Sequence, residues 1–251
     1  MSMISGSALQ ALGQDVFIFE VEGTIPGTTG KQASKFKTSA ELYADGHIPG
    51  ASFLELAKLA EPGAPFANTR PTSARALAGI LGQLGLSSTA DRIVLYTRRP
   101  QHPKAHAGVG VMWTTRIWWV LQSWGFENVS ILDGCVHAAW QGELKTGVET
   151  YPAKTFDQSS LVDHSELKVE TAEIAAVAAT SAKQIELLDS LPNWPNTGER
   201  YGRSGHITGA ISADFYGVTD KESGAFTMKT VDEIKAYFSS RFDPSKPLIA
   251  Y

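Results

Sequence analysis

Short apolar runs alternate along the chain with stretches in which apolar residues recur at helical spacing. The runs VFIFE at 16–20, RIVLY at 92–96 and NVSIL at 128–132 have the length of buried strands. Residues 73–84 and 114–124 place apolar residues three and four positions apart, which predicts helices. Strands that alternate with helices in this way predict an α/β fold with a mostly parallel sheet covered on both faces.

The second half of the chain follows the same plan. An alanine-rich stretch, TAEIAAVAAT at 171–180, predicts a helix, and the apolar runs QIELLD at 184–189 and PLIAY at 247–251 predict strands. Between these strands, Thr230 and Glu233 in TVDE have the spacing of a capping box. A helix is therefore expected to begin there and to precede the last strand.

A nine-residue motif occurs once in each half. Residues 45–53 read DGHIPGASF and residues 204–212 read SGHITGAIS. In both halves the apolar strand after the motif ends on a tyrosine, Tyr96 and Tyr251. A repeat this long indicates two copies of one domain rather than a solenoid.

The repeat predicts the domain boundaries. We expect a first domain at 10–146, a polar linker at 147–167 and a second domain at 168–251. The first copy continues through further predicted elements after Tyr96, whereas the sequence stops at Tyr251. The second domain is therefore expected to be incomplete, truncated before the loop that follows its last strand.

Composition and charge exclude several classes of partner. Apolar residues make up 43% and charged residues 19%, with a net charge of -4 and no block of like charges, so neither a nucleic acid nor a membrane is expected as a partner. The N-terminus lacks a basic segment followed by an apolar one, which predicts no signal peptide. We therefore expect a cytoplasmic protein.

The chain has a single cysteine, Cys135, which excludes an internal disulfide and a thiolate-rich metal site. We interpret it as a small, half-buried residue with an ordinary thiol on a turn away from any active-site loop. His102 and His106 are four residues apart, but their loop contains prolines and no partner carboxylate, so no metal site is expected.

Other candidate residues have structural interpretations. His47 and His206 belong to the two GHIxGA turns and are expected to bond to nearby backbone, with catalysis as the alternative. Trp118, Trp119 and Trp124 have helical spacing and are expected in a core rather than in a stacking platform.

Five strings, taken in order, resemble the tandem rhodanese-type sulfurtransferases, which include thiosulfate and 3-mercaptopyruvate sulfurtransferases. They are DGHIPGASF, RIWWVLQSWGFENVSILDGC with the tryptophan of HAAW, LLDS followed by RYG, SGHITGA, and a strand ending in IAY. The resemblance implies two rhodanese-like domains, each a mostly parallel sheet flanked by helices. It also implies that the first domain is catalytically silent and that the second carries a nucleophilic cysteine directly after Tyr251.

In that family, sulfane sulfur passes from thiosulfate or 3-mercaptopyruvate to cyanide or a thiol acceptor through a cysteine persulfide. The resemblance thus implies a small anionic sulfur donor, no cofactor and a monomer. Arg200, in GERYG, stands where the family has a substrate-binding arginine, and a solvated loop arginine is the alternative. Leu191 stands where a second family arginine is usual, which puts the usual substrate preference in doubt.

Two observations favour a rival interpretation, a catalytically dead rhodanese-like module used for binding or regulation. Thr97, which follows Tyr96 in the first copy, has no thiol. The second copy has no cysteine within the sequence given, so this chain is expected to be inactive. Phosphatases of this fold need an arginine six positions after a cysteine, and no such pair exists. The loop after Thr97 either attracts anions or is simply solvated, and its basic residues are Arg98, Arg99, His102, Lys104 and His106.

Overall fold

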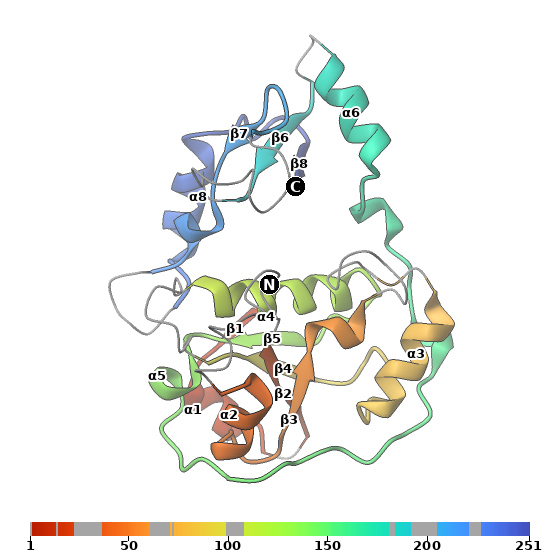
Figure 1. Ribbon diagram of the computed structural model, residues 1–251, viewed down its shortest axis with the longest axis vertical. Coiled ribbons are helices and arrows are strands. Elements are labelled where there is room, and N and C mark those ends of the chain that lie inside the picture. The colour runs from red at the N-terminus through yellow and green to blue at the C-terminus, as the bar shows by residue number, and fades with distance from the viewer. Residues whose placement is uncertain are drawn as a thin grey trace. The chain divides into compact units, whose positions relative to one another are not determined.

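The chain divides into two units in its structure, a computed structural model (Figure 1). The first unit contains residues 1–165, and the second contains the described residues from Glu166 to Tyr251. The structure describes residues 2–13, 15–22, 37–60, 71, 73–98, 108–180, 184–191, 205–220 and 227–251.

A five-stranded sheet forms the centre of the first unit, and every pairing in it is parallel. The strand order is β1-β5-β4-β2-β3. The three apolar runs form β2, β4 and β5 as predicted, whereas the short edge strand β1 was not predicted. The strands are β1 (Ser2–Ile4), β2 (Phe17–Glu22), β3 (Ala51–Glu55), β4 (Ile93–Tyr96) and β5 (Val129–Leu132).

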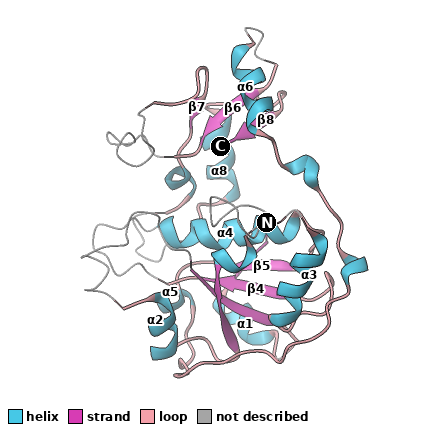
Figure 2. Ribbon diagram, turned by 45° about the vertical axis from the view of Figure 1, so that its right-hand side comes forward, coloured by secondary structure: helices cyan, strands magenta, loops and turns pink. Residues whose placement is uncertain are grey.

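Helices cover both faces of this sheet (Figure 2). Leu77 of α3 and Ile117 of α4 belong to the core cluster on one face, and Leu9 of α1 and Val136 of α5 belong to the cluster on the other. The α/β class with a parallel sheet flanked by helices is thereby confirmed. The helices are α1 (Gly6–Ala11), α2 (Ser39–Asp45), α3 (Ala74–Gln83), α4 (Gly108–Gln122) and α5 (Val136–Ala139), with 3-10 turns at η2 (Leu56–Leu59) and η3 (Gln158–Ser160).

The helix α4 begins earlier than its predicted start at residue 114. Its first turns bury Val111 and Trp113, so the apolar end of the predicted polar loop is helical. In α3, Ser73 is the N-cap, because the Ser73 hydroxyl accepts a hydrogen bond from the backbone N–H of Ala76 at 3.2 Å.

The segment predicted as a linker, 147–167, belongs almost entirely to the first unit. Phe156 is buried in its core, and the Tyr151 hydroxyl accepts a hydrogen bond from the backbone N–H of Ile18 at 2.7 Å. This segment, residues 147–165, is called the strap below. It passes so close to α3 that a side chain at Gly82 would meet the Lys154 carbonyl oxygen at 2.5 Å. The sequence of the strap resembles a linker because it is polar and has no regular apolar period. A few aromatic side chains nevertheless hold it against the first unit.

The second unit contains a three-stranded parallel sheet in the order β7-β6-β8. The predicted capping box of α8 is confirmed: the Thr230 hydroxyl accepts from the Glu233 backbone N–H at 3.3 Å, and the Glu233 carboxylate accepts from the Thr230 N–H at 2.9 Å. The elements are η4 (Ser165–Leu167), α6 (Thr171–Ala179), β6 (Glu186–Asp189), β7 (Ile211–Ser212), η5 (Phe215–Val218), α8 (Val231–Ser239) and β8 (Leu248–Ala250).

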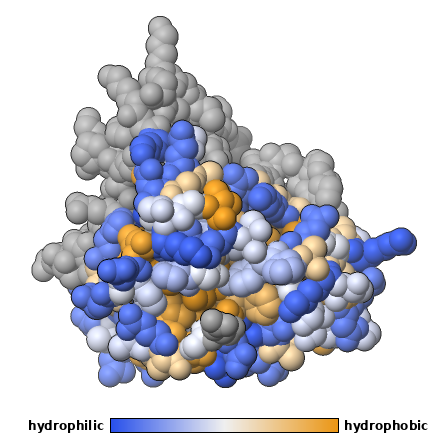
Figure 3. Space-filling model, turned by 90° about the horizontal axis from the view of Figure 1, so that it is seen from below, coloured by the Kyte–Doolittle hydropathy of each residue, from blue (hydrophilic) through white to orange (hydrophobic). Residues whose placement is uncertain are grey.

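Hydrophilic residues predominate on the face of the first unit that Figure 3 shows, and hydrophobic residues are scattered among them in small groups. No helix in the described part of the chain has the length and apolar character needed to cross a membrane.

Candidate functional site

Each unit places an acidic residue and a tyrosine opposite each other on neighbouring parallel strands. In the first unit the register pairs Glu20 of β2 with Tyr96 of β4. In the second unit Leu188 pairs with Ala250, so Asp189 lies opposite Tyr251. Open α/β sheets bind their ligands beyond the carboxyl ends of the strands. These two strand ends are therefore the candidate sites.

At the first strand end, the acid and the tyrosine are fully buried and bonded to each other. The Tyr96 hydroxyl donates to Glu20 Oε2 at 2.7 Å and accepts from the backbone N–H of Ile48 at 3.3 Å. Burial, and then the nearby Glu20 charge, raise the pKa of Tyr96 far above its ordinary value. The hydroxyl therefore remains a hydrogen-bond donor to the carboxylate.

Arg98 neutralises this buried carboxylate. Its Nε donates to Glu20 Oε1, and its Nη2 donates to Glu20 Oε2 at 2.8 Å and to the carbonyl oxygen of Gly46. Only 8% of Arg98 is exposed. For Arg98, both interpretations of the loop, as anion-attracting and as simply solvated, are therefore wrong, because a buried carboxylate needs this partner. The other basic residues of that loop lie outside the described residues: Arg99, His102, Lys104 and His106.

The residue directly after the first tyrosine, Thr97, is 4% exposed, and its carbonyl accepts from the backbone N–H of Val136 at 2.9 Å. Cys135, the N-cap of α5, precedes Val136 and is 3% exposed. The expectation of a half-buried cysteine is therefore wrong, because Cys135 is buried at the start of α5. Even so, the position after the strand is a threonine, which cannot carry a persulfide.

His47 bonds through both ring nitrogens, as the turn interpretation predicts. Its Nδ1 lies 3.0 Å from the carbonyl oxygen of Tyr43, and its Nε2 lies 3.0 Å from Glu149 Oε2. The hydrogen bond from Lys145, together with those from the Gly50 N–H and His47, lowers the pKa of Glu149 to about 2. His47 thus anchors the strap to the turn.

The second strand end repeats part of the bonding of the tyrosine. The Tyr251 hydroxyl accepts from the backbone N–H of Ile207 at 3.1 Å, as the Tyr96 hydroxyl accepts from that of Ile48. Desolvation raises the pKa of Tyr251. His206, the residue before Ile207, is exposed, whereas its counterpart His47 is buried.

The main chain of Tyr251 is held as well as its side chain. Its N–H donates to the Leu188 carbonyl at 3.0 Å, and its carbonyl accepts from the Ser190 N–H at 3.2 Å and the Ser190 hydroxyl at 2.7 Å. Leu191, which follows, is 38% exposed and brings no positive charge to this strand end. Tyr251 is thus fixed at the end of β8 through its N–H and its carbonyl oxygen.

Arg200, the predicted substrate-binding residue, lies outside the described residues, and its role remains a prediction. The described residues contain no group of three or more histidine, cysteine, aspartate or glutamate side chains that could hold a metal ion.

The sequence patterns did not predict the ion pair between Glu20 and Arg98. An acid that ends the apolar run VFIFE was the available signal, since a buried charge requires a partner.

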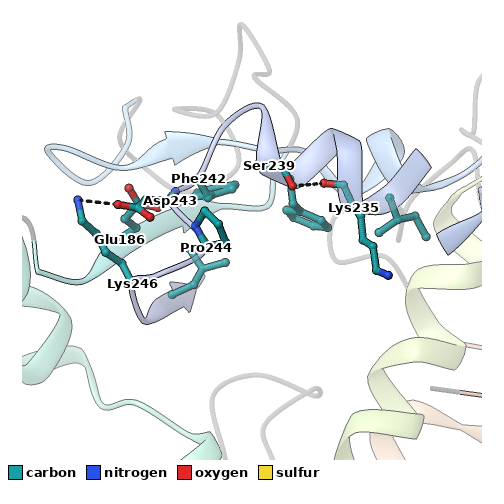
Figure 4. A pocket seen from close by; sticks show the side chains of 10 residues that line it. Glu186, Lys235, Ser239, Phe242, Asp243, Pro244 and Lys246 are labelled. Carbon is teal, nitrogen blue, oxygen red and sulfur yellow. Dashed lines mark hydrogen bonds and ion pairs between the residues drawn. The ribbon is translucent and has the colours of Figure 1, made fainter. Parts of the chain in front are cut away.

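A hollow of about 320 Å³ lies beside α8, at the other end of the second sheet (Figure 4). Glu186 and Leu248, the first residues of β6 and β8, line it, so it lies at the amino ends of the strands. Its other lining is largely apolar, and the Lys246–Asp243 ion pair, 3.7 Å long, borders it. This hollow is therefore separate from the strand-end site.

No family model matches the chain. The rat 3-mercaptopyruvate sulfurtransferase is 25% identical over 214 residues, which cover 83% of this chain and 67% of the relative. The chicken thiosulfate sulfurtransferase is 29% identical over 217 residues, 85% of this chain and 70% of the relative.

Two solved structures of sulfur-transfer proteins share the fold. The Escherichia coli 3-mercaptopyruvate sulfurtransferase SseA, described as having the rhodanese fold, superimposes with a TM-score of 0.72 at 22% identity and covers 100% of this chain and 88% of its own. The yeast mitochondrial complex I sulfur transferase subunit gives a TM-score of 0.77 at 22% identity, covering 100% and 84%. Sequence similarity and fold together identify the chain as a relative of the rhodanese-type sulfurtransferases, as its motifs indicated.

Proposed function

We propose that the protein transfers sulfane sulfur from thiosulfate or 3-mercaptopyruvate to cyanide or a thiol, through a persulfide on a cysteine directly after Tyr251. The observation that supports this most is the fixed carboxyl end of β8, where Tyr251 is bonded through its N–H, carbonyl and hydroxyl groups. Residues 1–251 alone contain no such cysteine and are expected to be inactive.

The chemistry requires a thiolate at the start of a loop after a strand. The thiolate attacks the outer sulfur of thiosulfate, the sulfur–sulfur bond breaks, and sulfite leaves with the bonding electrons. Cyanide then attacks the outer sulfur of the persulfide, which forms thiocyanate and returns the thiolate. Backbone N–H groups that converge in a loop before a helix stabilise such an anion. The two covalent half-reactions predict ping-pong kinetics.

We propose that the two units are copies of one domain and that the first is silent. The strand order β7-β6-β8 follows the same connections as β3-β2-β4, and in each copy the tyrosine hydroxyl accepts from the backbone N–H of the residue after the motif histidine. In the first copy, Thr97 replaces the nucleophile and Arg98 is bound to Glu20. We further propose that the protein acts as a cytoplasmic monomer.

The test is thiocyanate formation by the full-length protein, after its coding sequence has been read beyond codon 251. We expect a cysteine at the next position, activity with thiosulfate or 3-mercaptopyruvate, and loss of activity when serine replaces that cysteine. Another residue at this position, or a protein inactive with both donors, contradicts the proposal. It would favour the second candidate, a catalytically dead binding module, which Thr97 and Leu191 already favour.

Arg200→Ala tests the proposed substrate site. A cation that binds an anionic donor contributes through charge-assisted hydrogen bonds, so its loss should raise the KM for thiosulfate by about tenfold or more. Arg241→Ala is the control, because Arg241 follows α8 and bonds to the Tyr237 carbonyl of that helix. Equal KM values for the two variants would contradict a binding role for Arg200.

A further inference from the structure

The histidine of the first motif, His47, has a hydrogen-bond acceptor opposite each of its ring nitrogens. Its side chain is fully buried. Nδ1 lies 3.0 Å from the carbonyl oxygen of Tyr43, and Nε2 lies 3.0 Å from Glu149 Oε2. A carbonyl oxygen has no hydrogen to donate, so Nδ1 must carry one. Nε2 must carry a hydrogen as well if the side chain of Glu149 is ionised.

The surroundings of Glu149 keep its side chain ionised. Lys145 Nζ donates to Oε1, and the backbone N–H of Gly50 donates to Oε2 at 2.9 Å. These bonds lower the pKa of Glu149 to about 2, with the bond from Lys145 as the largest cause. At neutral pH the carboxylate can therefore only accept. Donation from both ring nitrogens is possible only for the imidazolium form of His47.

The aromatic ring of Tyr43 favours the same charged form. The rings of Tyr43 and His47 are stacked, with centroids 4.1 Å apart and planes inclined by 18°. A cation over the face of an aromatic ring is attracted by the negative charge of that face. Hydrogen bonding and stacking are separate observations, and both indicate a positively charged ring.

The other charges around this turn are paired. Arg98, which bonds to the carbonyl oxygen just before His47, is paired with Glu20. Lys145 is paired with Glu149. The ionisable groups of α2, β2, β4 and the neighbouring segments that lie around the turn are Tyr43, Asp45, Glu20, Tyr96, Arg98, Lys145 and Glu149. None of these groups is an unpaired cation that would repel the imidazolium.

The contacts of His47 coincide with the attachment of the strap. Next to them, the Glu149 N–H donates to the Tyr43 hydroxyl at 3.0 Å, and the Gly147 N–H donates to the Ala44 carbonyl at 2.8 Å. Loss of one proton from His47 would leave a bare nitrogen opposite an acceptor. One of the two side-chain bonds would then be lost, and the attachment would weaken.

We propose that His47 is a doubly protonated latch for the strap, and that alkaline solution loosens the strap by removing one of the two ring protons. The proposal concerns residues of the first unit alone and does not depend on sulfur transfer. Because the fold favours the protonated ring, the stabilisation is complete in mildly acidic solution and is lost as the pH rises.

The first test counts the hydrogens on the ring. In residues 1–251 labelled with nitrogen-15 histidine, long-range proton–nitrogen spectra separate protonated from bare ring nitrogens, and the His47→Gln variant assigns the signals. At about pH 7.5 we expect two protonated nitrogens for His47 and a mostly neutral ring for the exposed His206. Glu149→Gln keeps the shape of the side chain but removes its charge, so the neutral ring of His47 should predominate there.

The second test follows hydrogen exchange of the strap between about pH 6 and pH 9, corrected for the intrinsic effect of pH on exchange. Loss of one charge-assisted bond should lower the protection of strap peptides by about tenfold in the wild type. Glu149→Gln, which lacks the charged pair, should show little change with pH. His206→Gln is the control, because it removes an exposed histidine and should keep the wild-type response.

A single protonated nitrogen on His47 in the wild type would overturn the proposal, and so would identical His47 spectra for the wild type and Glu149→Gln. Equal losses of strap protection in these two proteins would also contradict it, since the pH effect would then arise elsewhere. Constant protection of the wild-type strap up to pH 9 would show that the ring proton does not hold the strap.

Discussion

Among single residues, Glu20 has a buried carboxylate that requires hydrogen-bond and ion-pair partners. It is 1% exposed, yet it accepts hydrogen bonds from Tyr96 and Arg98. A buried ion pair contributes little net stability when complete, but removal of one partner leaves an uncompensated charge. The Glu20 strand end of the first unit is therefore a structural centre.

Arg98→Ala tests this demand. We expect it to lower the free energy of unfolding by about 3–5 kcal/mol, measured by urea denaturation. Lys37→Ala removes the exposed ion pair with Asp45 and should cost about 1 kcal/mol or less. A loss of similar size in both variants would contradict a structural role for the Glu20–Arg98 pair.

Glu149 predicts a pH dependence. Its pKa is about 2 in the fold, below the ordinary 4.5, so the folded state favours the carboxylate. This stabilisation is complete above pH 4.5 and is lost as the pH falls towards 2. The difference in unfolding free energy between wild type and Glu149→Gln should therefore shrink between pH 5 and pH 2. A difference that is constant over this range would rule out the lowered pKa.

At the scale of elements, side-chain caps mark where short helices begin. Thr230 and Glu233 cap α8, and Thr38 and Glu41 form the same capping box at α2. The sequences TVDE and TSAE both carry this signature, but only the first was used to predict a helix. The seven-residue α2 has too few apolar positions to show a period, so its cap was the one local signal.

Thr230→Ala tests the cap of α8. It removes the oxygen that accepts from the Glu233 N–H and should cost about 1 kcal/mol. Thr230→Ser keeps that oxygen and should cost little. Hydrogen exchange of the α8 amides should accelerate in Thr230→Ala alone, and equal rates in both variants would show that the capping bond does not stabilise the helix.

At the scale of the whole molecule, the two units differ in how completely they bury matched strands. Ile93, Val94 and Leu95 of β4 are fully buried, whereas Leu248 of the equivalent β8 is 44% exposed. The core cluster among the described residues of the second unit consists of Leu188, Ala213 and Phe242, with a few partly buried neighbours. Folding of the second unit therefore removes less apolar surface from water, and the hydrophobic effect stabilises this unit less than the first.

Residues 1–251 should therefore show unequal protection from hydrogen exchange. Peptides from β6 and β8 are expected to exchange much faster than peptides from β2 and β4, because local opening is easiest where few apolar contacts are lost. Mass spectrometry after timed deuterium labelling measures this. Equal protection in the two sheets would contradict the difference in core size.

Sequence patterns predicted much of the architecture but fewer of the bonds at the strand ends. The apolar runs located β2, β4, β5, β6 and β8. The strap was misassigned because Tyr151 and Phe156 are isolated aromatic residues in a polar segment, and only their contacts with the first unit show that they are anchors.

The sequence by itself determined the local choices: which runs form strands, where α8 begins, and the family that its motifs resemble. These depend on residues close together in the chain, whose spacing and hydrogen-bonding groups are visible as letters. The tertiary structure alone decided that Arg98 binds Glu20, that Lys154 lies against Gly82, and that Ser190 holds Tyr251. Those contacts join residues that are distant in the chain, and they arise only when folding brings their segments together.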